Sequence, residues 1–207
     1  QTFVYVAIPG FILSIFFLLI KEPIRRPSIG PIESKLGLGQ LLDFYKQHKA
    51  TIIYHHLGNL SLLLTGYSFV FWSITFFVRV HGLEAAEASQ IFGWIFLVFG
   101  PLGPLLIALL AKKLTDQGHK DANITAGMIG GIITIPTILL ILVAPNAFWA
   151  FIFYAPALTA VNSPFGIAGG ALPVITPPNL RARVAAGYML TGAIGMMLGP
   201  PLAGAFN

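Results

Sequence analysis

The sequence predicts an all-α integral membrane protein with six transmembrane helices. The 207-residue chain is 56% hydrophobic and only 9% charged, and its mean hydropathy is +0.82. A soluble domain carries roughly 25% charged residues, so this chain cannot cover a water-facing surface. Its 22 glycines and 15 prolines are typical of transmembrane helices, where both residues are enriched. The composition argues against soluble catalysis, nucleic-acid binding and intrinsic disorder.

Six apolar stretches are long enough to cross a bilayer as helices, which takes about 20 residues each. None contains Asp, Glu, Lys or Arg, and none alternates polar and apolar residues as barrel strands do. Backbone amides in lipid must be paired within their own segment, so the stretches are expected to be helical. They are residues 2–20, 52–78, 89–111, 122–144, 147–175 and 184–206.

The charged residues lie in the connections and predict the orientation of the chain. The first, third and fifth connections hold every Lys and Arg except Arg79, which lies in the second connection with Glu84 and Glu87. Basic connections remain on the cytoplasmic side, so residue 1 is expected outside. The net charge of +5 is therefore a topology signal and not a nucleic-acid-binding patch.

The long first connection, residues 21–51, offers two interpretations. After a region rich in proline and glycine, Leu41, Leu42, Phe44 and Tyr45 alternate with charged and polar residues. This pattern suits a helix lying in the inner membrane interface. The alternative is a plain linker that frays into the next helix. The expected organisation is thus one helix in residues 1–20, this connection, and a helical region in residues 52–207.

The order of these features resembles the major facilitator superfamily, entered at its sixth helix. Residues 21–26 resemble the exit from helix six, and residues 75–82 the outer end of helix seven. Residues 100–122 are similar to helix eight and the cytoplasmic loop repeat. Residues 176–183 and 195–200 are similar to the tenth loop and the eleventh helix. The branch that the chain resembles is the Spinster-like one with its bacterial relatives.

This resemblance implies helices six to eleven of a twelve-helix bundle, mostly its C-terminal half. The other helices, including the N-terminal ones, would come from a longer chain. The implied function is secondary active transport of a small organic or amphipathic solute by alternating access across the cell (inner) membrane. Symport with a proton or ion is left open, since coupling carboxylates would lie in the missing half. A non-transporting membrane subunit or a channel-like protein is the alternative.

The resemblance also assigns a cytoplasmic loop motif. The family usually carries Asp where this chain has Lys112, and that carboxylate helps to hold the cytoplasmic gate. Asp116, four residues later, is the candidate substitute. The residues of the motif are Lys112, Asp116, Gly118, Lys120, Arg181 and Arg183.

An enzyme, a cofactor site and a metal site are not expected. The chain has no Cys, and no acid lies in an apolar stretch, where an intramembrane protease or ion relay would need one. His55 and His56 are adjacent, so they point to different faces of a helix and do not converge on a metal. We interpret both as interfacial residues.

Uncharged polar residues within the apolar stretches are the candidates for a substrate cavity. Tyr154, Leu158 and Asn162 follow the i, i+4, i+8 spacing of one helix face, and prolines interrupt this stretch. Interrupted helices near mid-membrane are a recurring feature of transporter sites. The alternative is that such residues hydrogen-bond neighbouring helices. The candidates are Asn59, Tyr67, Tyr154, Asn162 and Tyr188.

Glycines at GxxxG spacing are expected to allow close contact between helices of one bundle. Dimerisation through these glycines is the alternative. The pairs are Gly127 with Gly131, Gly166 with Gly170, and Gly195 with Gly199.

Overall fold

The computed structural model describes residues 2–19, 21, 38–167, 170 and 172–206, and all regular structure within these ranges is helical. The chain divides into two units, Gln1–Leu36 and Gly37–Asn207. The first contains α1 (Thr2–Phe17), close to the span predicted for residues 2–20. Most of the long first connection, residues 22–37, lies outside the described residues.

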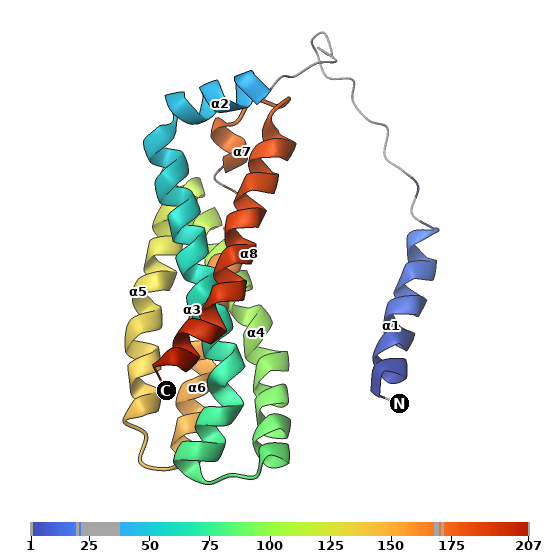
Figure 1. Ribbon diagram of the computed structural model, residues 1–207, viewed down its shortest axis with the longest axis vertical. Helices are drawn as coiled ribbons and strands as arrows, with labels where there is room; N and C mark the ends of the chain where they lie inside the picture. The colour runs from blue at the N-terminus through green and yellow to red at the C-terminus, as the bar shows by residue number, and fades with distance from the viewer. Residues whose placement is uncertain (1, 20, 22–37, 168–169, 171, 207) are drawn as a thin grey trace. The chain divides into compact units, whose positions relative to one another are not determined.

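The second unit is a bundle of long helices, with α2 lying across one end of it (Figure 1). Successive long helices run in opposite directions along the bundle. The helices are α2 (Leu38–Gln47), α3 (Lys49–His81), α4 (Ala85–Asp116), α5 (Ala122–Leu142), α6 (Ala147–Asn162), the 3₁₀ helix η1 (Ser163–Gly166), α7 (Leu172–Ile175) and α8 (Arg181–Ala205).

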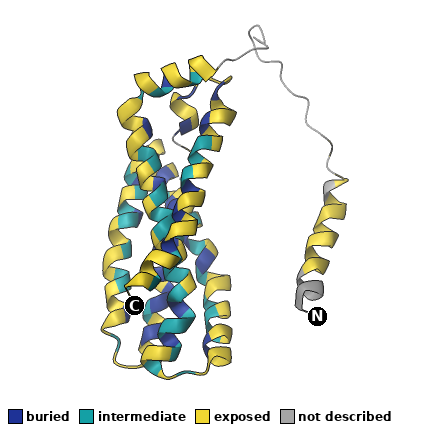
Figure 2. Ribbon diagram, in the orientation of Figure 1, coloured by how far each residue is buried: buried dark blue, intermediate teal, exposed yellow. Residues whose placement is uncertain are grey.

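Three helices of the described chain, α3, α4 and α5, are long and apolar enough to cross a membrane by length and composition. A shorter apolar helix covers Ala7–Phe16 within α1. Figure 2 shows that the outward faces of the bundle are mostly exposed, while buried residues gather along its interior. Many of the exposed side chains are large and apolar, such as Leu97 and Leu142 at 64% exposure each. Such a surface suits lipid and not water.

The stretch 147–175, which the sequence predicts as one membrane span interrupted by prolines, is divided into three short helices. α6 ends at Asn162 and continues as η1, and only Leu172–Ile175 returns to α-helix. Pro164 has no backbone N–H, so the carbonyl of Ala160 lacks its usual helical donor. The hydroxyl of Ser163 donates to that carbonyl at 2.8 Å instead. The apolar composition of the stretch does not distinguish this interrupted path from a continuous helix.

The core lies where α6 meets α3 and α4. Phe77 of α3 and Phe151 of α6 stack with ring centroids 3.9 Å apart and planes within 5°. Phe77, Ala157 and Leu158 are fully buried. Aromatic stacking of this kind fixes the position of α6 against α3.

α2 is a separate helix, which favours the first interpretation of the connection over a frayed linker. It ends at Gln47, and α3 begins at Lys49. Phe44 is buried, with 6% exposure, and the centroids of its ring and the His48 ring are 4.7 Å apart. Leu42 is exposed. Burial raises the pKa of the Tyr45 hydroxyl above its usual value of 10.0, so this hydroxyl stays protonated. The location of α2 in a membrane interface stays a prediction.

The two ends of the bundle differ in charge as the sequence predicts. The α4–α5 connection and the start of α8 lie at the same end as α2 (Figure 1). Lys112, Lys113, Lys120 and Arg181 therefore gather at this end. Arg79 lies at the opposite end, near the loop that joins α3 to α4.

Close backbone contacts join the helices in two pairs. In the first pair, formed by α8 and α3, a Cβ added at Gly195 would overlap the carbonyl oxygen of Leu60. A Cβ added at Gly199 would overlap the carbonyl oxygen of Leu64. In the second, a Cβ added at Gly166 of η1 would overlap the carbonyl oxygen of Pro104 of α4. The predicted role of these glycines in close packing is confirmed.

Gly131 does not take part in such a contact. Among the described residues, no atom lies within 4 Å of a Cβ added there, so Gly131 does not form the predicted close contact within this part of the bundle. A Cβ added at its GxxxG partner Gly127 would lie 3.1 Å from Cδ1 of Ile167. Spacing alone therefore does not identify which glycines face a neighbouring helix.

Candidate functional site

The five residues predicted to line a substrate cavity lie in three different places. Tyr67 and Asn162 line one pocket, Asn59 and Tyr188 line another, and Tyr154 is part of the core. The structure thus brings the residues together in pairs and not as one cavity.

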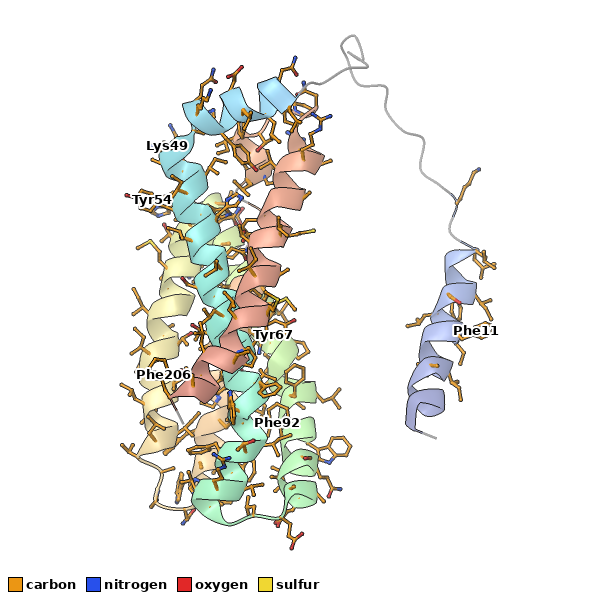
Figure 3. All side chains as sticks on the ribbon, in the orientation of Figure 1. Phe11, Lys49, Tyr54, Tyr67, Phe92 and Phe206 are labelled. Carbon is orange, nitrogen blue, oxygen red and sulfur yellow. The ribbon has the colours of Figure 1, made fainter. Side chains whose placement is uncertain are left out.

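The first pocket, which we call the Asn162 pocket, has a volume of about 310 Å³. Tyr67 lies on α3 near the middle of the bundle's length (Figure 3). α6 ends at Asn162 and η1 begins at Ser163, so the pocket lies where the α6 segment is interrupted. The pocket is lined by Gly66, Tyr67, Val70, Phe96, Asn162 and Phe165.

Aromatic rings make up much of the wall of the Asn162 pocket. Tyr67 from α3 and Phe165 from η1 are 41% and 42% exposed, and Phe96 from α4 is 40% exposed. Gly66 leaves room beside them, because a Cβ at this position would meet Val161 and Phe165 only at 3.5 and 3.9 Å. An apolar pocket with a few polar groups is the usual form of a small-molecule site.

Asn162 and Tyr67 are the residues with polar side-chain groups among those that line this pocket. Asn162 Nδ2 donates to the backbone carbonyl of Leu158 at 2.9 Å. The helix interruption places this side chain at the end of α6, where the helical backbone pattern stops. The pocket can therefore offer hydrogen bonds within an otherwise apolar wall.

The second pocket, of about 430 Å³, lies among α3, α5, η1 and α8. Asn59 is only 6% exposed, and its Nδ2 donates to the backbone carbonyl of Tyr188 at 2.9 Å. The Tyr188 ring stacks on His55 with centroids 5.0 Å apart and planes within 19°. Asn59 thus joins two helices, which matches the helix-contact alternative for this residue.

Tyr154 lies in the core and not beside Asn162. Its ring is 2% exposed and stacks on Phe69 with centroids 4.8 Å apart. Its hydroxyl forms a hydrogen bond with the hydroxyl of Ser73, which in turn donates to the carbonyl of Phe69. Since Ser73 has one proton to donate, Tyr154 is the donor in the pair. Tyr154 lines a separate pocket of about 160 Å³, which does not include Asn162.

Four lining residues of the Asn162 pocket are absent from the sequence prediction. Gly66, Val70, Phe96 and Phe165 are apolar, and apolar residues are unremarkable in a membrane helix. One available signal is that Gly66, Tyr67 and Val70 share a helix face. Another is that Phe165 directly follows Pro164, at the interruption.

The residues of the loop motif lie near the basic end of the bundle. Lys112 donates to Asp116 at 2.7 Å, and both side chains are exposed to solvent. Gly118 has a φ of 89°, a left-handed conformation that favours glycine. Arg181 Nε donates to the backbone carbonyl of Thr176 at 3.2 Å, and Lys120 and Arg183 are exposed. Asp116 therefore pairs with the very lysine that departs from the family pattern.

No cluster of three or more His, Cys, Asp or Glu that could hold a metal ion occurs among the residues that the structure describes.

The fold is similar to that of a bacterial homolog of the human lysosomal transporter Spinster, crystallised in an inward-facing and unoccupied conformation. The TM-score is 0.63 and the sequence identity is 24%. The likeness covers 96% of this chain and 42% of that chain, so this chain spans less than half of the length of that protein. No protein-family model and no curated protein matches the sequence. The chain is an integral membrane protein that shares the fold of the matching part of this Spinster homolog, as the resemblance stated from the sequence predicts.

Proposed function

We propose that the chain is part of a secondary active transporter that moves a small organic or amphipathic solute by alternating access. The Asn162 pocket forms one wall of the substrate cavity in this proposal. Its main support is that polar groups and aromatic rings converge at an interrupted helix. Interrupted helices expose backbone and side-chain polar groups at transporter sites. The shared fold with a transporter homolog is consistent with this function.

The remaining parts of the machinery are also proposals. The facing wall of the cavity comes from N-terminal helices of the same, longer protein. Any coupled proton or ion binds there, since no Asp, Glu, Lys, Arg or His lines the Asn162 pocket. The protein lies in the cell (inner) membrane with its lysine- and arginine-rich end in the cytoplasm. At that end, Lys112 and Asp116 belong to the gate.

The proposal is tested by Asn162→Leu in the full-length protein, reconstituted into proteoliposomes. The change removes the carboxamide but keeps similar bulk. Solute uptake should fall several-fold, because one lost hydrogen bond is worth about 0.5–1.5 kcal/mol. The melting temperature should change little, because the hydrogen bond that Asn162 Nδ2 donates lies within its own helix, to the carbonyl of Leu158.

A matched control is Gly166→Leu, four residues further along. Its side chain would overlap the backbone of Pro104, so this variant should lose stability whatever the role of the pocket. A lower melting temperature of Asn162→Leu with unchanged uptake affinity would remove Asn162 from the substrate site.

A further inference from the structure

The backbone carbonyl of Leu158 determines which way the Asn162 carboxamide is oriented. The carbonyl oxygen of Leu158, 2.9 Å away, can only accept a hydrogen bond. The amide atom that faces it must therefore be the nitrogen, which settles the orientation of the group. No described residue donates to the remaining oxygen, Oδ1. The side chain thus presents an acceptor to a ligand and uses one of its donors within α6.

The rest of the pocket wall favours an uncharged, planar apolar body. The rings of Tyr67, Phe96 and Phe165 come from three different elements and are each partly exposed at the pocket. Aromatic faces pack well against planar groups. No ionisable Asp, Glu, Lys, Arg or His lies among the lining residues. A buried charge without a partner is strongly disfavoured, and this wall offers a charged group no partner of opposite charge.

The volume of the pocket also leaves space for a flat ring system. Its volume is about 310 Å³. Gly66 contributes to this space, and its neighbours Val161 and Phe165 lie at ordinary contact distance from the position of an added Cβ. A methyl group at this position would therefore narrow the pocket without forcing the helices apart.

We propose that the Asn162 pocket selects solutes in which an uncharged hydrogen-bond donor, such as a hydroxyl or a ring N–H, is attached to a planar apolar body. The donor binds Asn162 Oδ1, and the body packs among Tyr67, Phe96 and Phe165. This inference rests on the proposed function, because it names the class of solute that the same site accepts.

The test compares indole and benzofuran as probes of the purified full-length protein. The two molecules have nearly the same shape, but indole carries an N–H donor where benzofuran carries an oxygen acceptor. Binding is measured by calorimetry, and competition between the two probes gives the ratio of their affinities. Indole should bind roughly two- to tenfold more tightly, the range expected for one hydrogen bond. Equal affinity for the two probes, or tighter binding of benzofuran, overturns the inference, and measurements on the wild-type protein are enough to show it.

Two variants locate the preference within the structure. Asn162→Leu should bind both probes equally, because it removes the acceptor. Tyr154→Phe, which changes a core hydroxyl outside the pocket, should keep the wild-type ratio. A preference for indole that survives in Asn162→Leu places the acceptor elsewhere and overturns the assignment. If that variant does not fold, Gly66→Ala takes its place and should weaken the binding of both probes.

A third comparison tests the requirement for an uncharged solute. Indoleacetate and tryptamine carry a carboxylate and an ammonium group on the same ring system, and both should bind more weakly than indole. Tighter binding of either one overturns this part of the inference. Because binding is measured without transport, a preference for indole in a protein that shows no uptake would refute the proposed function and leave the inference standing.

Discussion

The carboxamide of Asn59 in α3 donates a hydrogen bond to the backbone carbonyl of Tyr188 in α8, with 2.9 Å between Nδ2 and the oxygen. The approach depends on Gly192, one turn further along α8. A Cβ at that position would lie 2.9 Å from Asn59 Nδ2 and 2.5 Å from Leu63 Cδ1. The hydrogen bond between α3 and α8 therefore requires that residue 192 has no side chain. It gives Asn59 a role unlike that of Asn162.

We expect Asn59→Leu to lower stability without changing the affinity for the solute. Interhelical hydrogen bonds in membrane proteins contribute about 0.6 kcal/mol on average, so the loss should be small but measurable. Thermal melting of the purified protein and uptake kinetics in proteoliposomes check the two parts. A change in apparent affinity with an unaltered melting curve would instead place Asn59 in the solute site.

A pair of glycine substitutions tests the contact between α3 and α8. Gly195→Ala should strongly destabilise the protein, because the added methyl group overlaps the backbone carbonyl of Leu60. Gly131→Ala is the matched control, since no atom lies within 4 Å of the new methyl group. The control should keep the wild-type melting temperature or raise it slightly, as alanine favours helix over glycine. Equal destabilisation of both variants would contradict the described packing.

Orientation can be tested with single cysteines, because the chain has none of its own. Glu84→Cys should react with a membrane-impermeant maleimide added to intact cells. Lys120→Cys should react only after the membrane is permeabilised. Both side chains are exposed, so access to the reagent depends on the side of the membrane. The reverse pattern would invert the orientation predicted from the basic connections.

The ion pair of Lys112 and Asp116 should matter little for stability. Both side chains are exposed, and exposed pairs within one helix are weak and screened by salt. Lys112→Ala is therefore expected to melt within error of the wild type, at low and at high salt. A large fall in melting temperature at low salt would show that the pair has a further partner. An effect on uptake with unchanged stability would support its place in the gate.

The 207-residue chain on its own should show no saturable uptake in proteoliposomes. A transporter of the proposed kind encloses its solute between two halves, at the interface near the bilayer midplane. The chain spans 42% of the protein whose fold it shares, and supplies one wall. The full-length protein is the positive control. Saturable uptake by the short chain would refute the two-wall arrangement.

The sequence predicts those features of the fold that depend on contact with lipid or with water. Apolar stretches and basic connections are required by the bilayer, so the long helices and the charged end appear largely where expected. The interruption after Asn162 is different, because most residues around it are apolar and would suit a continuous membrane helix equally well. Only Pro164 indicates it beforehand, and proline also occurs within continuous helices such as α4.

Site residues were harder to predict, because their role depends on neighbouring helices. Tyr154, Leu158 and Asn162 do share one face of α6, as their spacing requires. Along most of its length, that face meets the packed rings of α3 and α4, and only its last residue reaches the Asn162 pocket. Helical periodicity gives the direction of a side chain, but not what lies in that direction.

The glycine contacts also bear on how the bundle can deform. Backbone contacts of this kind contain no side-chain rotamers that could rearrange, so we expect α3 with α8, and α4 with η1, to move as two rigid pairs. The Asn162 pocket takes its wall from both pairs, with Tyr67 on one and Phe96 and Phe165 on the other. A tilt between the two pairs would change the width of the pocket without breaking a glycine contact, but it would have to shift the stack of Phe77 on Phe151.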